Sequence, residues 1–439
     1  MKQDVLASEM SAFLMNEEEW YRGSIVYVTF RLFCLDRQQE TIGFFVSLLC
    51  TIRRKCMKAQ KVGKMAIFSV GAVLFSAHAG GGFATGNQAD TYYVGLGWTG
   101  IVSAVIAMLL LILTMREAMV MYNQRHLTSA KELFQNLYHP FDKLEILFEI
   151  FFNIMVLMAV AAAISGAASA LQQYFGFNYY ACVVVIGVIV LCLTIFGASV
   201  VRMASTYMGM AILVTAIIIY GMGIMKGQSI GSILAADFAT NGFANMPKAI
   251  LNAFTYAGFQ CVTLPTIVAC GAILPDRKSC SKAMWISFVM NAVALVLSVM
   301  MLISWKSVYG VTTLPTLTSL NAMNANWMVV VYGICLLLCL ISTAVTTTFG
   351  FVARFENISI LKNVESPVKK RVIVSAFIII VSMTISLAGL TNIIKYGYGY
   401  CGYLAIAIII IPFLTVGVYK NYHTASVDVK EGAEVYENN

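Results

Sequence analysis

Long continuous runs of apolar residues occupy most of the chain from about residue 64 onward, and short polar segments separate them. A membrane-spanning helix needs about 20 predominantly apolar residues, so the runs predict ten such helices. Their expected ranges are about 64–87, 92–115, 144–171, 180–198, 204–225, 246–272, 283–304, 326–353, 372–389 and 392–419. The pattern therefore predicts an all-α integral membrane protein with ten transmembrane helices.

The composition agrees with this prediction. Of the 439 residues, 59% are hydrophobic and 11% are charged, and the mean hydropathy is +0.80. Soluble proteins carry about 25% charged residues. We attribute the net charge of +8 to basic residues on one side of the membrane rather than to a nucleic-acid partner. The expected surroundings are a lipid bilayer.

Basic residues fall mainly on one side of the predicted helices. If the N-terminus lies inside, the inner segments hold most of them, for example Arg116, Arg277 and Lys370. The outer segments then hold only Lys226, Lys248, Lys306 and Lys395. Lys and Arg collect in cytoplasmic loops of membrane proteins. Because ten is an even number of spans, both termini are predicted to be cytoplasmic, in a multi-pass protein of the cell membrane.

The chain divides into three parts. Residues 1–56 are more polar and charged than the rest, and the apolar run within them, 41–52, is too short to span a membrane. Met57 opens a short basic segment before the first span. We interpret 1–56 as an N-terminal extension, with the hypothesis that it is a misassigned start, 57–421 as the ten-helix domain, and 422–439 as a cytoplasmic tail.

Three glycines interrupt the first predicted span, in the string Ala77-His78-Ala79-Gly80-Gly81-Gly82-Phe83-Ala84-Thr85-Gly86. Each Gly costs about 1 kcal/mol relative to Ala inside a helix. Unpaired backbone groups in lipid add several kcal/mol each, so such an interruption is tolerated only inside protein or beside water. In transporters it often forms the substrate site. The alternative is close helix packing through small residues.

The sixth span has a similar irregularity. Pro247 precedes a polar, Gly-containing segment at 252–260, and Pro265 follows it. Interrupted helices at matching positions are the mark of an inverted repeat in transporters. Because spans one and six each open a group of five, we predict a 5+5 inverted repeat, with repeat one at about 64–225, repeat two at about 246–419, and helices 1 and 6 discontinuous.

The glycine string also carries a resemblance to a known family. Residues 80–86 resemble the G-x-G-F-A-[ST]-G signature of the YkvI-like amino-acid permeases. That family belongs to the amino acid–polyamine–organocation superfamily, so the resemblance implies a LeuT-like fold over about 60–420. This chain departs from the family at Asn87-Gln88, where Gln-Glu is common, and at His78.

The expected solute site contains no acidic or basic side chain, which favours a neutral or zwitterionic solute such as an amino acid. Its carboxylate would bind free N–H groups at the break in span one, and its ammonium would face freed carbonyls. Aromatic residues and Gln260 would shape the pocket or act as gates, or would simply pack between helices. The candidate solute-binding residues are Gly80, Gly81, Gly82, Phe83, Ala84, Tyr256, Ala257, Gly258, Phe259 and Gln260.

Span eight offers a candidate cation site. Thr343, Thr346 and Thr347 share one helix face. Together with backbone carbonyls of Ser76 and Ala79 they would present only oxygen ligands, which suit a hard cation such as Na⁺. This arrangement resembles the sodium site between spans one and eight of sodium-coupled LeuT-like transporters. The alternative is that the hydroxyls bond the carbonyls of the preceding helical turn.

Two titratable residues could couple transport to protons instead. His78 lies beside the glycine break, and an imidazole changes charge near neutral pH. Glu149 lies about two turns into span three and would pair with Arg116 or Lys143. No Lys occurs within span five, unlike proton-linked relatives that place one there. Sodium and proton coupling both remain open.

These patterns favour a secondary active transporter that works by alternating access around a central site. The alternative is a non-transporting amino-acid sensor on the same fold. A membrane-embedded enzyme is disfavoured, because the four His residues do not cluster with other catalytic groups. We expect no transition metal and no cofactor other than a coupling Na⁺ or H⁺. The sequence does not identify the solute, the direction of transport or the oligomeric state.

Overall fold

The computed structural model describes residues 63–196, 213–274, 276–355, 361, 364 and 366–423. The chain separates into two compact units, Met1–Lys61 and Val62–Asn439. All the described residues belong to the second unit. The predicted N-terminal extension, 1–56, and nearly all of the predicted tail, 422–439, lie outside the described residues.

Helices are the only regular structure among the described residues. The first predicted span is divided into α4 (Lys64–His78), α5 (Gly81–Ala84) and α6 (Asn87–Tyr92). The remaining long helices are α7 (Trp98–Gln124), α9 (Glu145–Phe175), α10 (Tyr179–Phe196), α13 (Met246–Gln260), α15 (Arg277–Tyr309), α17 (Asn326–Phe355) and α18 (Pro367–Ser386). Shorter helices are α8 (Ala130–Tyr138), α12 (Ile230–Asn241), α14 (Leu264–Gly271), α16 (Pro315–Ala322), α19 (Leu390–Asn392) and α20 (Gly399–Ala405).

Seven helical segments of the described chain are long and apolar enough to cross a membrane. A helix at Leu213–Lys226 and α12 together make an eighth candidate, bent by 73°. Of the other predicted spans, the first is divided at the glycines, which leaves α4 with 15 residues, and that at 372–389 coincides with most of α18. Multiple membrane-spanning helices are thus present, while the count of ten and the 5+5 repeat stay predictions.

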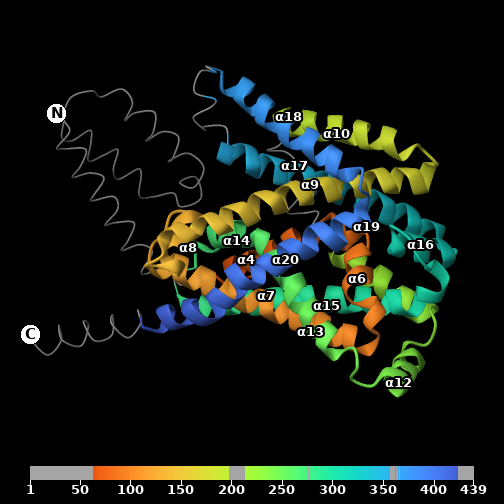
Figure 1. The fold of residues 1–439 in the computed structure, drawn as a ribbon. Coiled ribbons are helices and arrows are strands. Elements are labelled where there is room, and N and C mark those ends of the chain that lie inside the picture. Colours follow the sequence, from red (N-terminus) through yellow and green to blue (C-terminus); the bar gives the residue numbers. More distant parts are fainter. Residues whose placement is uncertain are drawn as a thin grey trace, which may run out of the picture. The chain divides into compact units, whose positions relative to one another are not determined.

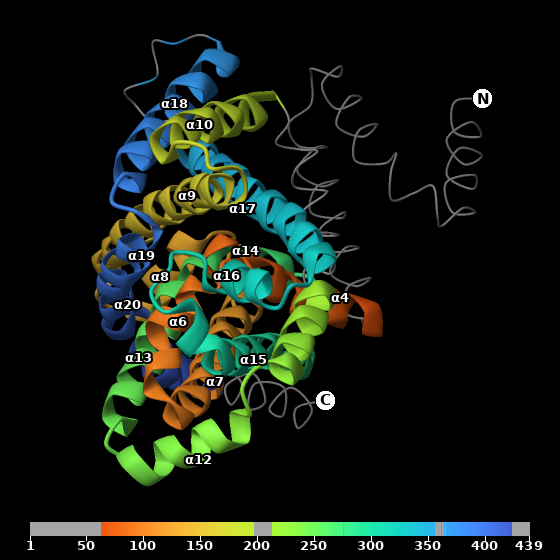
Figure 2. The ribbon, with the colours of Figure 1, turned by 90° about the vertical axis from the view of Figure 1, so that its right-hand side faces the viewer.

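The long helices form two groups (Figure 1). Helices α9, α10, α17 and α18 pack on one another, and α4, α7, α13, α14 and α15 make up the second group. Figure 2 shows the same division from the side, with α16 near α15 and α17. The hydrophobic core is continuous through both groups. This division matters because a cavity of about 390 Å³ lies between the groups.

The chain leaves helical conformation at the end of α4. Ala79 closes α4 with a hydrogen bond from its N–H to the Phe75 carbonyl, and Gly80 is extended, with φ −66° and ψ −175°. A second irregularity follows at Gly86, whose φ of 78° is readily adopted only by glycine. Any Cβ on Gly86 would also meet the Thr316 hydroxyl at 2.3 Å. The first predicted span is therefore a helix followed by two short helical pieces.

The sixth predicted span differs from expectation. The segment 252–260, predicted to be interrupted, is α-helical, and the irregular stretch comes later, as a 3-10 turn at Cys261–Thr263. The hydroxyl of Thr263 donates to the Gln260 carbonyl across this turn. Pro265, which has no N–H to offer, lies at the start of α14, where none is needed. The chain thus stays α-helical through 252–260, where we expected unpaired peptide groups, and tightens to i→i+3 bonding only at Cys261–Thr263.

Helices α13 and α20 cross at unusually close range. A Cβ on Gly258 would lie 2.5 Å from the Gly402 carbonyl oxygen, and one on Gly402 would lie 2.4 Å from the Thr255 carbonyl oxygen. Small residues permit such backbone approach in membrane helices. π-helical stretches at Ile393–Tyr398 and Ile406–Ile410 flank α20. Such stretches are frequent at functional sites.

Helix α8 is fixed at both ends. Ser129 accepts a hydrogen bond from the Glu132 N–H, and the Glu132 carboxylate accepts from the Thr128 N–H and hydroxyl. These bonds, the backbone N–H of Thr128 first, hold the pKa of Glu132 below its usual range. At the other end, the Lys420 ammonium donates to the carbonyls of Asn136, Leu137 and His139. The last helix of the described chain is therefore tied to α8.

Candidate functional site

A cavity of about 390 Å³ lies between the two helix groups. Helices α4 and α14 line it from one group and α9 and α17 from the other. Along α4 it extends from Ser69 to His78 and reaches Gly80, Gly81 and Gly82, and along α17 it extends from Cys339 to Gly350. None of its described lining residues is Asp, Glu, Lys or Arg.

The glycine break supplies peptide groups to this cavity. Among the described residues, the Ala77 and His78 carbonyls and the Gly81 and Gly82 N–H groups have no backbone partner. The Ala79 carbonyl differs, because the Cys339 thiol donates to it at 3.2 Å. Peptide groups that no helix satisfies can bind a ligand instead. The cavity thus combines an uncharged lining with unused backbone donors and acceptors.

The exposed part of the described cavity lining lies on one side. Ser69 on α4 is exposed, and Ala72, Val73, Ser76 and Ala77 are partly exposed. Beyond Gly80 the exposure stops, because every residue of 81–89 is buried. The solvent-accessible route therefore runs along the N-terminal part of α4, and the chain beyond the break is sealed.

Five aromatic rings form the first layer of this seal, and we call them the aromatic plug: Tyr92, Tyr93, Tyr256, Phe259 and Tyr398. The Tyr256 and Phe259 rings lie 4.8 Å apart, and the Phe259 and Tyr398 rings 5.1 Å. Phe259 and Tyr398 also line the cavity. The hydroxyl of Tyr92 donates to the Ile394 carbonyl at 2.8 Å, which ties α6 to the last helix.

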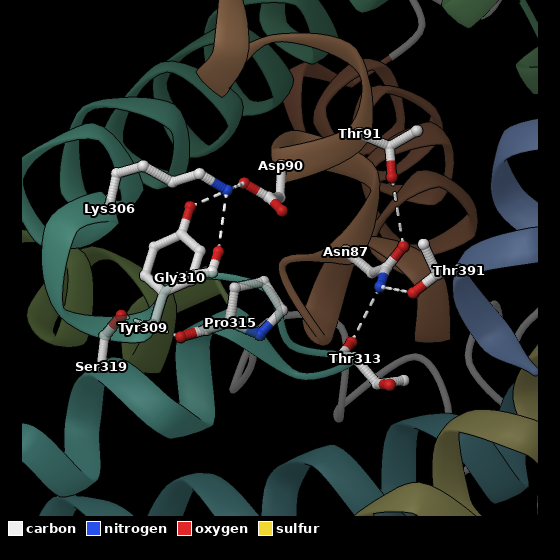
Figure 3. Close-up of polar contacts among 10 residues, drawn as sticks. All are labelled: Asn87, Asp90, Thr91, Lys306, Tyr309, Gly310, Thr313, Pro315, Ser319 and Thr391. Atoms are coloured by element: carbon white, nitrogen blue, oxygen red, sulfur yellow. Dashed lines mark hydrogen bonds and ion pairs between the residues drawn. The ribbon is translucent and has the colours of Figure 1, made fainter.

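A polar network forms the second layer (Figure 3). The Asn87 amide donates to the Thr313 carbonyl and the Thr391 hydroxyl, both at 2.8 Å. One turn later Asp90 accepts from Lys306 at 2.8 Å and from the Tyr309 hydroxyl at 2.7 Å. Asp90 thus joins α6 to α15, whereas Asn87 joins α6 to the loop before α16 and to α19.

Replacing Asn87 with Ala is expected to loosen the sealed side. The change leaves the Thr313 carbonyl without its donor, which costs about 1–2 kcal/mol, so opening on this side should become about 5–30-fold more frequent. Hydrogen exchange in lipid nanodiscs, read by mass spectrometry at the peptide that covers α6, measures this opening. Asn392→Ala is the control, because the Asn392 amide donates only within its own turn, to Ala388. Equal exchange in both variants would contradict a sealing role for Asn87.

The structure brings together only part of the predicted solute site. Gly80, Gly81, Gly82, Phe259 and Gln260 line the cavity. Phe83 and Ala84 line a separate, much smaller cavity instead. Tyr256 and Ala257 are fully buried, and Gly258 faces Gly402 of α20. The helical form of 252–260 explains this, because only one face of a helix can point into the cavity.

The predicted cation residues lie close to one another. Ser76, Thr343, Thr346 and Thr347 all line the cavity, and a Cβ on Gly80 would lie 3.4 Å from the Thr343 hydroxyl. The Thr346 hydroxyl donates to the Ser342 carbonyl at 2.8 Å, which is the alternative we considered. That bond uses the proton of the hydroxyl and leaves its oxygen able to coordinate. Ala79 does not line the cavity.

The predicted partners of Glu149, Arg116 and Lys143, were wrong. Its carboxylate pairs with Arg354 of α17 at 2.8 Å, and the Arg354 guanidinium also lies over the Phe152 ring. Arg116 pairs with its neighbour Glu117 instead. Glu149 is absent from the cavity lining. Sequence could not place Arg354, which lies 205 residues away, on the facing helix.

His78 lies in the cavity wall and bonds across the break. Its Nε2 lies 2.9 Å from the Tyr256 hydroxyl, which donates to the Gln88 side-chain oxygen at 3.0 Å. His78 is 2% exposed and Tyr256 is fully buried. Gln88, Tyr398 and Cys339 were not among the predicted site residues, although all three line the cavity. The only signal for Gln88 was its place after the glycine motif.

No group of three or more metal-ligating side chains occurs in the part of the chain that the structure describes. No protein-family profile and no curated protein matches the chain. Solved structures match it in fold. A Na⁺-coupled sialic acid symporter, substrate-bound and outward-open, aligns with a TM-score of 0.54 and 12% identity, over 80% of this chain and 90% of its own.

Two further transporters align similarly. A manganese transporter from Eremococcus coleocola has a TM-score of 0.53 and 16% identity, over 80% of this chain and 78% of its own. Mhp1, a nucleobase-cation-symport-1 family transporter, has a TM-score of 0.51 and 14% identity, over 74% and 73%. All three are LeuT-fold transporters and not enzymes. The chain therefore has this fold, while its membership in the YkvI-like family stays a prediction.

Proposed function

We propose that this protein is a secondary active transporter of a small neutral or zwitterionic solute, an amino acid, and that it works by alternating access. One observation carries the proposal: an uncharged cavity meets the unpaired carbonyls of Ala77 and His78 and the unpaired N–H groups of Gly81 and Gly82, and the exposed part of its described lining lies on one side. Alternating access requires a central site that is open to one side of the membrane at a time. The likeness in fold to secondary transporters supports it.

The lining favours a zwitterion over a charged solute. A polyamine would need a carboxylate and an acidic solute would need Arg or Lys, and the described lining offers neither. Peptide groups at the break would bind the amino acid backbone, while Phe259, Gln260 and Tyr398 would surround its side chain. A cavity of about 390 Å³ falls within the usual size of small-molecule sites.

The number and orientation of the transmembrane helices are part of the same proposal. We infer ten transmembrane helices in a 5+5 inverted repeat, with both termini cytoplasmic in the cell membrane, as the distribution of Lys and Arg favours. The open side of the cavity, along the N-terminal part of α4, would then face the cytoplasm. Membership in the YkvI-like permeases, on the motif at 80–86, fits this assignment.

A proteoliposome experiment tests the proposal. The full-length chain is reconstituted and given a mixture of labelled L-amino acids under a Na⁺ gradient, a proton gradient or neither. Saturable uptake above that of empty liposomes is expected. If the mixture raises the melting temperature of the protein but never accumulates inside, the protein is a sensor and transport is ruled out.

We also propose that Na⁺ binds beside the solute, between α4 and α17. Ser76, Thr343, Thr346 and Thr347 line this part of the cavity, and the Ala79 carbonyl lies next to it. Oxygen-only ligation suits such a cation.

Replacing both Thr346 and Thr347 with Val is expected to raise the Na⁺ concentration for half-maximal uptake about tenfold or more. The change removes two hydroxyl oxygens while keeping the side-chain shape. Uptake measured against Na⁺ concentration checks this, with Thr384→Val as the control, because the exposed Thr384 hydroxyl bonds its own helical turn. Wild-type uptake that is indifferent to Na⁺ would rule out this site.

A further inference from the structure

Four buried side chains form a line across the glycine break, and we call them the His78 chain: Asn291, His78, Tyr256 and Gln88. They come from four different helices, α15, α4, α13 and α6. All four are at most 4% exposed, and His78 and Gln88 line the cavity. The contacts are 2.9 Å from His78 Nε2 to the Tyr256 hydroxyl and 3.0 Å from that hydroxyl to Gln88 Oε1.

The hydrogen bonds along this line assign one tautomer to His78. With the Gln88 oxygen toward Tyr256, the single hydroxyl proton of Tyr256 goes to Gln88, and His78 Nε2 carries the hydrogen that it donates to Tyr256. A neutral imidazole then has a bare lone pair at Nδ1. The Asn291 side chain lies near the imidazole. Both amide hydrogens of Asn291 are directed at Ser287, to its carbonyl at 2.8 Å and its hydroxyl at 3.0 Å.

The orphaned atoms are therefore two acceptors. His78 Nδ1 and Asn291 Oδ1 each lack a hydrogen-bond partner among the described residues. Buried polar atoms without partners are rare, and each one calls for a physical explanation. One added proton at Nδ1 would let it donate to Oδ1. The line would then read Oδ1···H–Nδ1, Nε2–H···Oη and Oη–H···Oε1, with every acceptor satisfied.

We propose that His78 is the binding site of a coupling proton, which adds to Nδ1 from water in the cavity and is held by Asn291. This rests on the transport function proposed above. The proton reaches His78 from the open side, because His78 lines the cavity, and cannot leave through the sealed residues beyond Gly80. When the protein opens to the other side, the same site exchanges its proton there.

No charged group of the described structure offsets an imidazolium at this position. The titratable groups that face this region are Tyr256 of α13, Cys339 of α17 and Tyr398 just before α20. The only titratable residue of helix α14 is Cys270. The basic residues of α15 lie toward its two ends, away from Asn291 in its middle: Arg277, Lys278, Lys282 and Lys306. In α6, Asp90 is paired with Lys306.

A buried cation without a counter-charge is strongly unfavourable in a membrane. The carboxylate of a bound amino acid in the same cavity supplies that counter-charge. Solute and proton therefore stabilise each other, and such mutual stabilisation is what couples the two fluxes. It follows that solutes lacking a carboxylate should not be proton-coupled.

Protonation can be read directly by nuclear magnetic resonance. The chain has only four His residues, so ¹⁵N-histidine labelling of the full-length protein in nanodiscs gives few signals, and His78→Gln identifies that of His78. We expect an Nε2–H tautomer at high pH and an imidazolium at low pH. A mixture of L-amino acids should move the midpoint upward by about one pH unit, and the corresponding amino-acid amides should not. A His78 signal that stays neutral down to pH 4, or an unmoved midpoint, overturns the proposal.

Solute uptake at different pH values is the second test of a coupling proton on His78. A gradient of about two pH units is expected to raise wild-type uptake of the labelled amino acids about tenfold. His78→Gln should lose this stimulation, and Asn291→Asp should move the pH profile of uptake upward, because a carboxylate beside Nδ1 favours the imidazolium. His423→Gln, which changes an exposed His outside the cavity lining, should behave as wild type.

The two proposals fail in different ways. If no solute accumulates under any gradient, the transport function falls. If solutes accumulate equally with and without the pH gradient, or if His78→Gln retains the stimulation, the transport function stands and His78 does not carry the proton.

Discussion

Gly81→Leu is expected to abolish solute uptake, with a reduction of about 100-fold or more, while the chain still inserts and folds. A Cβ at this position would lie 2.2 Å from the Leu340 Cδ2 and 3.8 Å from the Ala163 Cα. The added side chain must therefore displace Leu340 or extend into the cavity at the break. Either outcome removes the space in which the backbone of a solute would lie. Uptake by proteoliposomes, normalised to reconstituted protein, measures the effect.

A graded series separates loss of the site from loss of the fold. Gly81→Ala should reduce uptake about tenfold, and combining it with Leu340→Val should restore part of the loss, because the shorter side chain gives way to the new Cβ. Gly221→Leu is the matched control, since nothing lies within 4 Å of a Cβ there. Normal uptake by Gly81→Leu would contradict a solute site at the break.

Gly402→Ala is expected to destabilise the whole protein. Its Cβ would lie 2.4 Å from the Thr255 carbonyl oxygen, which belongs to the backbone of α13 and cannot rotate away. Helices α13 and α20 must separate, and overpacking of this kind costs about 1–3 kcal/mol. In a protein of this size we expect the melting temperature to fall by about 1–3 °C.

Thermal unfolding of purified protein in detergent checks this prediction. Gly399→Ala, one turn earlier in the same helix, is the control, because the nearest atom to its Cβ is the Tyr92 hydroxyl at 3.6 Å. Gly258→Ala, on the opposite side of the crossing, should match Gly402→Ala, since its Cβ meets the Gly402 carbonyl at 2.5 Å. Equal melting temperatures for Gly399→Ala and Gly402→Ala would show that the crossing tolerates a wider spacing.

The local features of this protein could be predicted from its sequence. Long apolar runs indicate helices wherever they occur, and the glycine string indicates a weak point in one of them, because both effects depend on neighbouring residues only. The helical form of 252–260 could not be predicted so simply. Pro247 and Pro265 lie at helix starts, where they are tolerated, and a sequence does not distinguish that position from a break.

The residues of the candidate site were harder to predict than the helices, because they come together only when distant segments pack. That His78 meets Tyr256, 178 residues away, follows from how α13 packs and not from any local pattern. The same is true of Glu149 and Arg354, which face each other across α9 and α17. Residues adjacent to the glycine break were predictable as cavity lining, and the threonines of the facing helix α17 were predictable from the helix face they share. Cys339, on the same helix, carried no such pattern, and its place in the lining depends on how the two groups pack.

The two-residue joint between α4 and α5 has a mechanical consequence. Ala79 and Gly80 alone separate a rigid rod of 15 residues from the sealed part of the chain. At 1.5 Å per residue this rod is about 22 Å long, so a swing of about 20° at the joint displaces its far tip by about 8 Å. Ser69 is near that tip and the joint is at the cavity floor. A rotation at these two peptides would therefore move the residues at the mouth of the cavity much further than those at its floor, and α15, which packs on α4, would have to move with it.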